Sequence, residues 1–258
     1  KTVREIGPHV SKKESHQQFL VFLLKSECFC CTSFNSINIY LYEKSDFLIS
    51  IQKKKLKDSK IKWIKNFNKI KKGPIIFFGN EFFDAIPIKQ FSYEKNLLLE
   101  KCYVINSNIG LNEAYQIASR EDVAKIKTFK VLKGLKFIEY PKLGLIELDK
   151  MVKKISEQTG GILLIDYGYL NIINRSTLQT VMKNKKMDMD SLFKNLGKAD
   201  ITSLVNFSLL EEYFKKKKLK VKKIVSQKFF LEKMGIIERA KILERKMNIK
   251  QLDYMSLT

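Results

Sequence analysis

Short apolar runs alternate with amphipathic stretches along the chain, and this alternation predicts strands followed by helices. Residues 75–78 and 162–165 are apolar throughout, which is typical of strands buried on both faces of a sheet. Residues 37–42 are β-branched and aromatic and predict another strand. Residues 45–55, with Ser45 as N-cap, and residues 143–158 have helical periodicity. Strands that alternate with helices indicate an α/β fold with a mostly parallel sheet.

Less regular patterns complete the expected order of elements. Short apolar segments predict further strands, at residues 3–6, 60–64, 89–93, 97–105 and 219–225. Helical spacing predicts further helices, at residues 14–25, 81–85, 112–119, 207–217 and 227–246, the last broken near Gly235. The hairpin-like pattern of the middle of the chain indicates an inserted lid or substrate-binding segment. We therefore expect half of the core at residues 1–87, the insertion at 88–142 and the other half at 143–258.

Glycine and acidic residues, with their immediate neighbours, follow several of the predicted strands. They are Gly7, Glu43, Gly79, Asn80, Glu81, Asp166, Tyr167 and Gly168. Because ligands bind at the carboxyl ends of the strands in such sheets, we expect these residues to meet at one edge. An acidic residue after the second strand, here Glu43, typically accepts hydrogen bonds from the ribose hydroxyls of a nucleoside. The alternative for Glu43 is an ordinary carboxylate at a strand end in solvent.

Two carboxylates, Glu81 and Asp84, lie three residues apart after the first apolar run. On a helical turn they would share a face, and they suit a cationic or amine-bearing substrate. The two phenylalanines between them would supply an apolar wall. The alternative is an acidic helix start that complements the helix dipole. Asp166 and Asp200 are further carboxylates beside apolar residues, and either could be structural.

The charge and composition narrow the class of partner. The net charge is +22, but only five of the 49 basic residues are arginine, and asparagine and isoleucine are abundant. This composition is typical of A+T-rich coding, whereas nucleic-acid sites favour arginine. A basic nucleic-acid-binding protein therefore stays the third-ranked class. The apolar runs are far shorter than the roughly 20 residues of a membrane span, so no span is expected.

Cysteine and histidine give little support for metal chemistry. Cys28, Cys30 and Cys31 are clustered and Cys102 is distant, unlike the spaced pairs of a structural zinc site. The two histidines both lie within the first 16 residues. We expect no metal. Reduced thiols without a secretory signal suit a bacterial cytoplasm, with the mitochondrial matrix as the alternative.

Three segments resemble the MidA-type methyltransferases, a family that includes the mitochondrial arginine methyltransferase of complex I assembly. They are residues 79–91 (GNEFFDAIPIKQF), 160–170 (GGILLIDYGYL) and 197–210 (GKADITSLVNFSLL). The resemblance keeps family order over residues 73–245. It implies a Rossmann-like, seven-strand class I methyltransferase sheet with an insertion, and S-adenosylmethionine as cofactor. It also implies a protein substrate, by analogy a respiratory complex I subunit that is symmetrically dimethylated on arginine.

The strand ends and the resemblance together assign roles to named residues. We expect Glu81 and Asp84 to be the catalytic pair, which would orient a guanidinium in line with the sulfonium methyl group. Cofactor binding is expected at Glu5, Gly7, Glu43, Gly79 and Asn80. Substrate binding is expected at Asp166, Tyr167 and Asp200.

The first loop departs from the family pattern. Glu5 and Gly7 match it, but His9 and Ser11 stand where the family has two further glycines. Residues 9–34 as a whole do not resemble the family, as a local frameshift or gene decay would produce. An impaired relative without cofactor binding is therefore the main alternative to an active enzyme. Because Lys1 is not a start residue, we expect further chain upstream.

Overall fold

The computed structural model describes residues 18–24, 37–57, 60–106, 110–182, 185–187 and 200–245 of the 258-residue chain. The chain divides into two compact units, residues 1–219 and 220–258. The site residues that are described all belong to the larger unit, which contains four sheets. The predicted first strand, with Glu5 and Gly7, and the cluster of Cys28, Cys30 and Cys31 lie outside the described residues.

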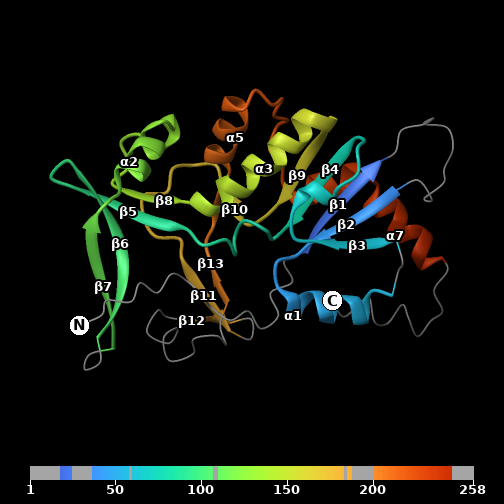
Figure 1. Cartoon of the computed structure of the whole chain (residues 1–258), viewed down its shortest axis with the longest axis horizontal. Helices are drawn as coiled ribbons and strands as arrows, with labels where there is room; N and C mark the ends of the chain where they lie inside the picture. Colours follow the sequence, from blue (N-terminus) through green and yellow to red (C-terminus); the bar gives the residue numbers. More distant parts are fainter. Residues whose placement is uncertain are drawn as a thin grey trace. The chain divides into compact units, whose positions relative to one another are not determined.

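The larger unit contains a five-stranded mixed sheet (Figure 1). Its order is β3 (Ile61–Ile64), β2 (Ile37–Tyr42), β1 (Gln18–Leu24), β4 (Ile75–Asn80) and β9 (Gly160–Ile165). β2 and β3 are parallel, as are β4 and β9, but β1 is antiparallel to both of its neighbours. The order is that of a doubly wound sheet whose central strand is reversed. The expected α/β class is confirmed, whereas the described residues show five strands of mixed direction in this sheet and not seven mostly parallel ones.

The strand β1 corrects the helix predicted at residues 14–25. Its sequence, QFLVFLL, contains aromatic and β-branched residues that also fit a strand. Without β1, the facing edges of β2 and β4 would each leave backbone N–H and C=O groups without partners. β1 pairs with both edges. Because buried backbone N–H and C=O groups need partners, this pairing outweighs the weak helical spacing.

The apolar strands β4 and β9 are less enclosed than the sequence predicts. Ile75 and Phe77 on one face of β4 are fully buried, but Ile76 on the other face is 38% exposed. The side chains of β9 are only partly buried. The long helix α3 (Lys142–Gln158) contacts both strands, and its buried residues complete the core on that face. The prediction that both strands are buried on both faces is therefore wrong.

Two predicted helices are confirmed, the first of them with the N-cap that was expected at Ser45. α1 (Asp46–Lys55) begins after Ser45, whose hydroxyl accepts a hydrogen bond from the Leu48 N–H at 3.2 Å. α5 (Phe207–Lys216) begins after Asn206, which accepts from the Leu209 N–H at 3.0 Å. In each case the side chain satisfies a donor that the first helical turn leaves without a partner.

Residues 89–140 contain an antiparallel sheet of their own. Its order is β7 (Gly110–Ile117), β6 (Leu97–Asn106), β5 (Lys89–Glu94) and β8 (Phe137–Tyr140). The hairpin of β5 and β6 is confirmed. The helix predicted at residues 112–119 is wrong, because this segment pairs with β6 along its whole length as β7. The helix α2 (Arg120–Lys127) follows it and buries Ile126.

Short strands and a helix pair complete the described chain. β12 (Lys185–Met187), β11 (Gln179–Met182) and β13 (Asp200–Thr202) form one small sheet. β10 (Gly168–Tyr169) and β14 (Val205–Asn206) pair in parallel. In the second unit, α6 (Gln227–Lys233) and α7 (Ile236–Glu244) are separated at Gly235, as expected. Residues 219–225 form no strand, contrary to the prediction.

Candidate functional site

The carboxyl ends of β2, β4 and β9 lie at one edge of the five-stranded sheet. Phe19 of β1 pairs with Tyr42 on one side and with Gly79 on the other, so these two strand ends are level. Asn80 pairs with Ile165, which brings the end of β9 to the same level. Glu43, Glu81 and Asp166, which follow these strands directly, therefore start from a common edge.

Asp166 connects the end of β9 to the turn that follows β4. Its Oδ2 accepts hydrogen bonds from the backbone N–H groups of Phe83 at 2.8 Å and Asp84 at 3.3 Å. Its Oδ1 accepts from the Tyr167 N–H at 2.9 Å. Burial raises the pKa of Asp166 and outweighs the opposing effect of these three donors. The carboxylate is thus a structural anchor that positions the turn.

Residues 81–86 form this turn and not the predicted helical segment. Glu81 has a positive φ of 49°, and its N–H donates to the Ile165 carbonyl at 2.9 Å, one step beyond the strand pair. The Asp84 carbonyl accepts from the Ser203 N–H at 3.0 Å. Hydrogen bonds with Ile165 and Asp166 at the end of β9, and with Ser203, therefore fix the turn in place of helical hydrogen bonds. Glu81 itself is exposed.

Asp84 is the electrostatic centre of the site. Burial raises the pKa of Asp84 to about 6, with further increases from the nearby charges of Asp166, Glu81 and Asp200. The Oδ1 atom of Asp84 is buried and has no hydrogen-bond partner among the described residues. The structure thus brings together four of the six carboxylates that the sequence singled out, namely Glu81, Asp84, Asp166 and Asp200. Such a group favours a bound cation, because a positive charge would stabilise the ionised form of Asp84.

Glu43 occupies a different part of the same edge. Its N–H donates to the Ile64 carbonyl at 3.1 Å. Its carboxylate accepts from the Ser45 N–H at 2.8 Å and from the Gln52 side chain at 3.5 Å. Since an ionised carboxylate has about four lone-pair sites, acceptor capacity is left for the two hydroxyls of a ribose. The half-buried position and this chemistry fit the nucleoside part of S-adenosylmethionine.

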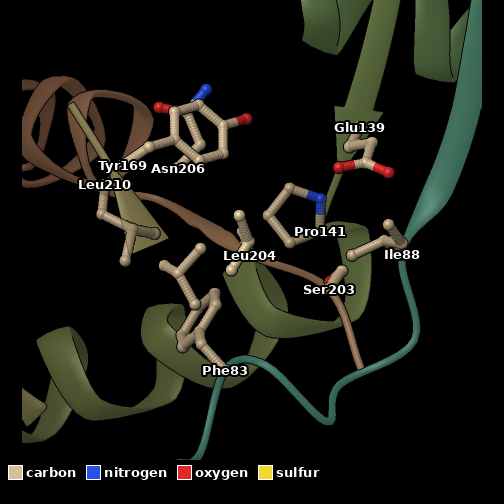
Figure 2. A pocket seen from close by; sticks show the side chains of 10 residues that line it. Phe83, Ile88, Glu139, Pro141, Tyr169, Ser203, Leu204, Asn206 and Leu210 are labelled. Carbon is tan, nitrogen blue, oxygen red and sulfur yellow. The ribbon is translucent and has the colours of Figure 1, made fainter. Parts of the chain in front are cut away.

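The predicted apolar wall lies behind Asp84. Phe82 and Phe83 are both buried, and their rings meet edge to face with centroids 5.7 Å apart. The Phe83 ring lies directly against Gly144 of α3. Phe83 also lines a small cavity of about 20 Å³, which is room for about one water molecule. Figure 2 shows Leu204 and Pro141 on the other walls of this cavity.

The sequence analysis missed a polar network at the rim of the cavity, centred on Glu139 of β8. Glu139 accepts hydrogen bonds from the Gln90 side chain at 2.8 Å and from the Thr177 N–H at 2.9 Å. The Thr177 hydroxyl donates to Glu139 and accepts from the Leu204 N–H at 3.0 Å. The network thus links the inserted sheet to the segment that anchors Asp84. A glutamate inside the short apolar strand FIEY was the available signal.

Tyr169 and Asn206 stand at the opposite wall of this cavity (Figure 2). Burial raises the pKa of Tyr169 to about 12, although a hydrogen bond with Asn206 opposes the shift. The predicted substrate residue Tyr167, by contrast, is 63% exposed. Among the described residues, no group of three histidine, cysteine or acidic side chains is arranged to hold a metal ion.

This arrangement of strand order, edge and carboxylates is that of an α/β nucleoside-binding fold. Residues 22–225, well over half of the chain, match the family described as "Putative S-adenosyl-L-methionine-dependent methyltransferase". The chain therefore belongs to this methyltransferase family, whose cofactor is S-adenosylmethionine. The family resemblance seen in the three motif segments is confirmed.

Curated relatives match over much of this chain but only about half of their own length. The mitochondrial protein arginine methyltransferase NDUFAF7 of Danio rerio is 25% identical over 71% of this chain and 42% of its own. Its homologue in Caenorhabditis elegans is 28% identical over 80% of this chain and 53% of its own. The chain is thus similar to part of each relative.

Solved structures support the fold. A Burkholderia thailandensis protein crystallised with S-adenosyl-homocysteine superposes with a TM-score of 0.55 at 17% identity. The match covers 69% of this chain and 48% of that protein. At this identity the likeness concerns the fold alone.

Proposed function

We propose that this chain is the catalytic part of a protein arginine methyltransferase that uses S-adenosylmethionine. In this proposal Glu81 and Asp84 hold the guanidinium of the acceptor arginine beside the methyl group. Asp166 anchors the turn that carries them, and Tyr167 and Asp200 line the approach. We further propose symmetric dimethylation of a respiratory complex I subunit or its bacterial equivalent, in a bacterial cytoplasm or in the mitochondrial matrix.

The observation that carries this proposal is the buried, unpartnered Oδ1 of Asp84 among neighbouring carboxylates. A guanidinium can donate two parallel hydrogen bonds to a carboxylate and would neutralise the repulsion between Asp84 and its neighbours. The names of the NDUFAF7 relatives support arginine as the acceptor. Since the sulfonium is already an activated methyl donor, the residues need only align the acceptor nitrogen and exclude water.

In this proposal Glu43 would hold the ribose hydroxyls, and Gly79 and Asn80 at the end of β4 would lie beneath the cofactor. Glu5 and Gly7 keep their predicted role in cofactor binding, outside the described residues. When bound, S-adenosylmethionine supplies the electrophilic methyl group. We also propose the division expected from the sequence. Residues 1–87 and 143–258 form the two halves of the core, and residues 88–142 form the substrate-binding insertion.

A second candidate function is that of an impaired relative without cofactor binding. The reversed direction of β1 favours it. In a doubly wound sheet the central first strand ends at the ligand-binding edge, where its loop approaches the ligand. Here β1 begins at that edge, because Gln18 pairs with Asn80 and the strand then runs away from it.

Two measurements on the purified chain distinguish these candidates. Titration with S-adenosylhomocysteine tests the cofactor site, and transfer of a labelled methyl group to arginine of a recombinant complex I subunit tests the acceptor site. Glu81→Gln and Asp84→Asn should each lower kcat/KM by about tenfold to a hundredfold, the value of a hydrogen bond to a charged group. Both should leave cofactor affinity nearly unchanged.

The matched control is Glu157→Gln, since Glu157 is an exposed carboxylate in the last turn of α3, outside the insertion and the site. Methyl transfer by Glu81→Gln and Asp84→Asn at the wild-type rate would refute their role. Failure of the wild-type chain to bind S-adenosylhomocysteine would favour the impaired relative.

A further inference from the structure

One edge of the five-stranded sheet carries an unusual density of positive charge. Ten exposed lysines surround the edge strand β3 and the end of α1, and we call them the lysine face. They are Lys53, Lys54, Lys55, Lys57, Lys60, Lys62, Lys65, Lys69, Lys71 and Lys72. Figure 1 shows α1 and β3 side by side, and the Trp63 side chain of β3 donates to Gln52 of α1 at 2.8 Å. The two elements therefore form one continuous surface.

The lysine face is distinguished by its shortage of acids and not by lysine itself. Residues 43–73 contain eleven lysines, three acidic residues and no arginine. Residues 88–142 contain nine lysines, one arginine and six acidic residues, and Lys89, Lys101 and Lys142 there form ion pairs. On the lysine face, the ion pair found in the described residues joins Lys65 to Asp46. A lysine-rich composition explains both regions, but it does not explain why neutralising acids are scarce in only one of them.

Two large apolar side chains at the ends of α1 are also exposed. α1 has no fully buried residue. Phe47 in its first turn is 63% exposed, and Leu56 just after its last turn is 37% exposed. Exposed aromatic and aliphatic side chains beside a cluster of lysines are typical of helices that lie in the interface of a membrane.

We propose that the lysine face docks peripherally on an anionic lipid surface, with Phe47 and Leu56 inserted between headgroups. Lysines attract anionic headgroups without a fixed geometry, and their aliphatic stems can lie along an apolar boundary. The absence of arginine from residues 43–73 disfavours nucleic acid, for which the guanidinium is the preferred contact. No helix in the described part of the chain could cross a bilayer, so the proposed contact is with the surface only.

This proposal is independent of methyl transfer and can be tested without it. The experiment is sedimentation of the full chain with phosphatidylcholine vesicles, with and without phosphatidylglycerol, at low and high salt. Trp63, the single tryptophan, lies next to the lysine face with the Lys53 ammonium 5.6 Å from its ring. Its fluorescence therefore provides a second readout, because docking should change the emission and expose it to quenching by brominated lipid.

The test variant replaces Lys53, Lys54, Lys55 and Lys57 by glutamine. The matched control replaces four exposed lysines of the insertion, namely Lys127, Lys130, Lys133 and Lys136. The test variant should lose more than about tenfold in binding to anionic vesicles, since each lysine near the surface contributes about a fivefold factor. The control should change binding by less than about twofold, because charges beyond a Debye length are screened. Phe47→Ser should weaken binding by about threefold to tenfold.

Three results would overturn the proposal. The first is equal binding to neutral and anionic vesicles, and the second is an equal loss in the control variant. The third is displacement of the chain from vesicles by a single-stranded oligonucleotide at a lower phosphate concentration than the lipid, which would identify nucleic acid as the partner. Circular dichroism of all variants would show that each is folded.

Discussion

The two halves of the sheet edge are built differently. In the acidic half, at the ends of β4 and β9, the Asp166 carboxylate accepts three backbone N–H groups and fixes the turn that carries Asp84. The other half, at the ends of β2 and β3, is called the nucleoside half because the proposed ribose contact lies there. Its Glu43 carboxylate accepts from Ser45 and Gln52, and the neighbouring Tyr42 and Lys44 side chains bond Glu147 of α3. The strand between the two halves, β1, runs opposite to the rest.

The two halves also differ in how closely their sequences resemble the family. The acidic half is made by the segments that match the family motifs, and hydrogen bonds between distant segments hold it. β1 belongs to the segment that departs from the family, residues 9–34, and it pairs with β2 of the nucleoside half and β4 of the acidic half alike. We infer that contacts between distant segments hold both halves, and that they differ in the group that makes these contacts. The acidic half is fixed by Asp166, a carboxylate of the candidate site, whereas the nucleoside half is fixed by Glu147 of α3, outside it.

Asp166→Ala should have the largest effect on stability. It would remove the acceptor of three backbone donors at once, and we expect a loss of about 2–4 kcal/mol in the free energy of unfolding. Urea unfolding monitored by circular dichroism would measure it. Asp46→Ala is the control, because Asp46 is exposed and pairs only with exposed Lys65, so about 1 kcal/mol or less is expected. Similar losses in both variants would show that the acidic half is not specially anchored.

Gly144→Ala tests the packing behind the acidic half. The new Cβ would lie 2.5 Å from the Phe83 ring, which is buried and has little room to move. Overpacking of this kind costs about 1–3 kcal/mol and should displace the turn that carries Asp84. Gly161→Ala is the matched control, since its Cβ would meet nothing within 4 Å. A loss of acceptor binding in the Gly144 variant, with cofactor binding retained, would separate the two halves.

The elements that could be predicted are those whose sequence pattern is local. The Ser45 cap, the α3 periodicity and the break at Gly235 depend on neighbouring residues, and all three were predicted correctly. The strands β1 and β7 were predicted as helices, because their conformation is decided by pairing with other strands, β2 and β4 for β1 and the preceding strand β6 for β7, and not by their own sequence.

The candidate site shows the same division. Glu43, Glu81 and Asp166 could be identified because each directly follows a recognisable strand. The turn geometry of Asp84 and the network around Glu139 could not, because both depend on contacts with segments far along the chain. The Thr177 hydroxyl, for example, donates to Glu139 and accepts from the Leu204 N–H, and these three residues meet only in the folded protein.

The stability of the protein should depend on pH through the ionisation of Asp84. Its pKa is raised from 3.8 to about 6 on folding, so the unfolded state releases its proton first as the pH rises. Wild-type protein should therefore lose stability between about pH 4 and pH 6 relative to Asp84→Asn. Above pH 6 the variant should be more stable by about 1–2 kcal/mol, after allowance for solvent screening. Parallel stability curves for the two proteins would contradict the burial of this charge.

Glu43→Gln should have the smallest effect on stability and still separate the two halves. Glutamine can accept the Ser45 N–H, so the free energy of unfolding should change by less than about 1 kcal/mol. Affinity for S-adenosylhomocysteine, measured by calorimetry, should fall by about tenfold, because a hydrogen bond to a charged acceptor becomes a neutral one. Asp46→Asn, three residues away, is the control and should bind like the wild type. If Glu43→Gln also bound like the wild type, the end of β2 would not hold the ribose, and the acidic half alone would remain as a candidate site.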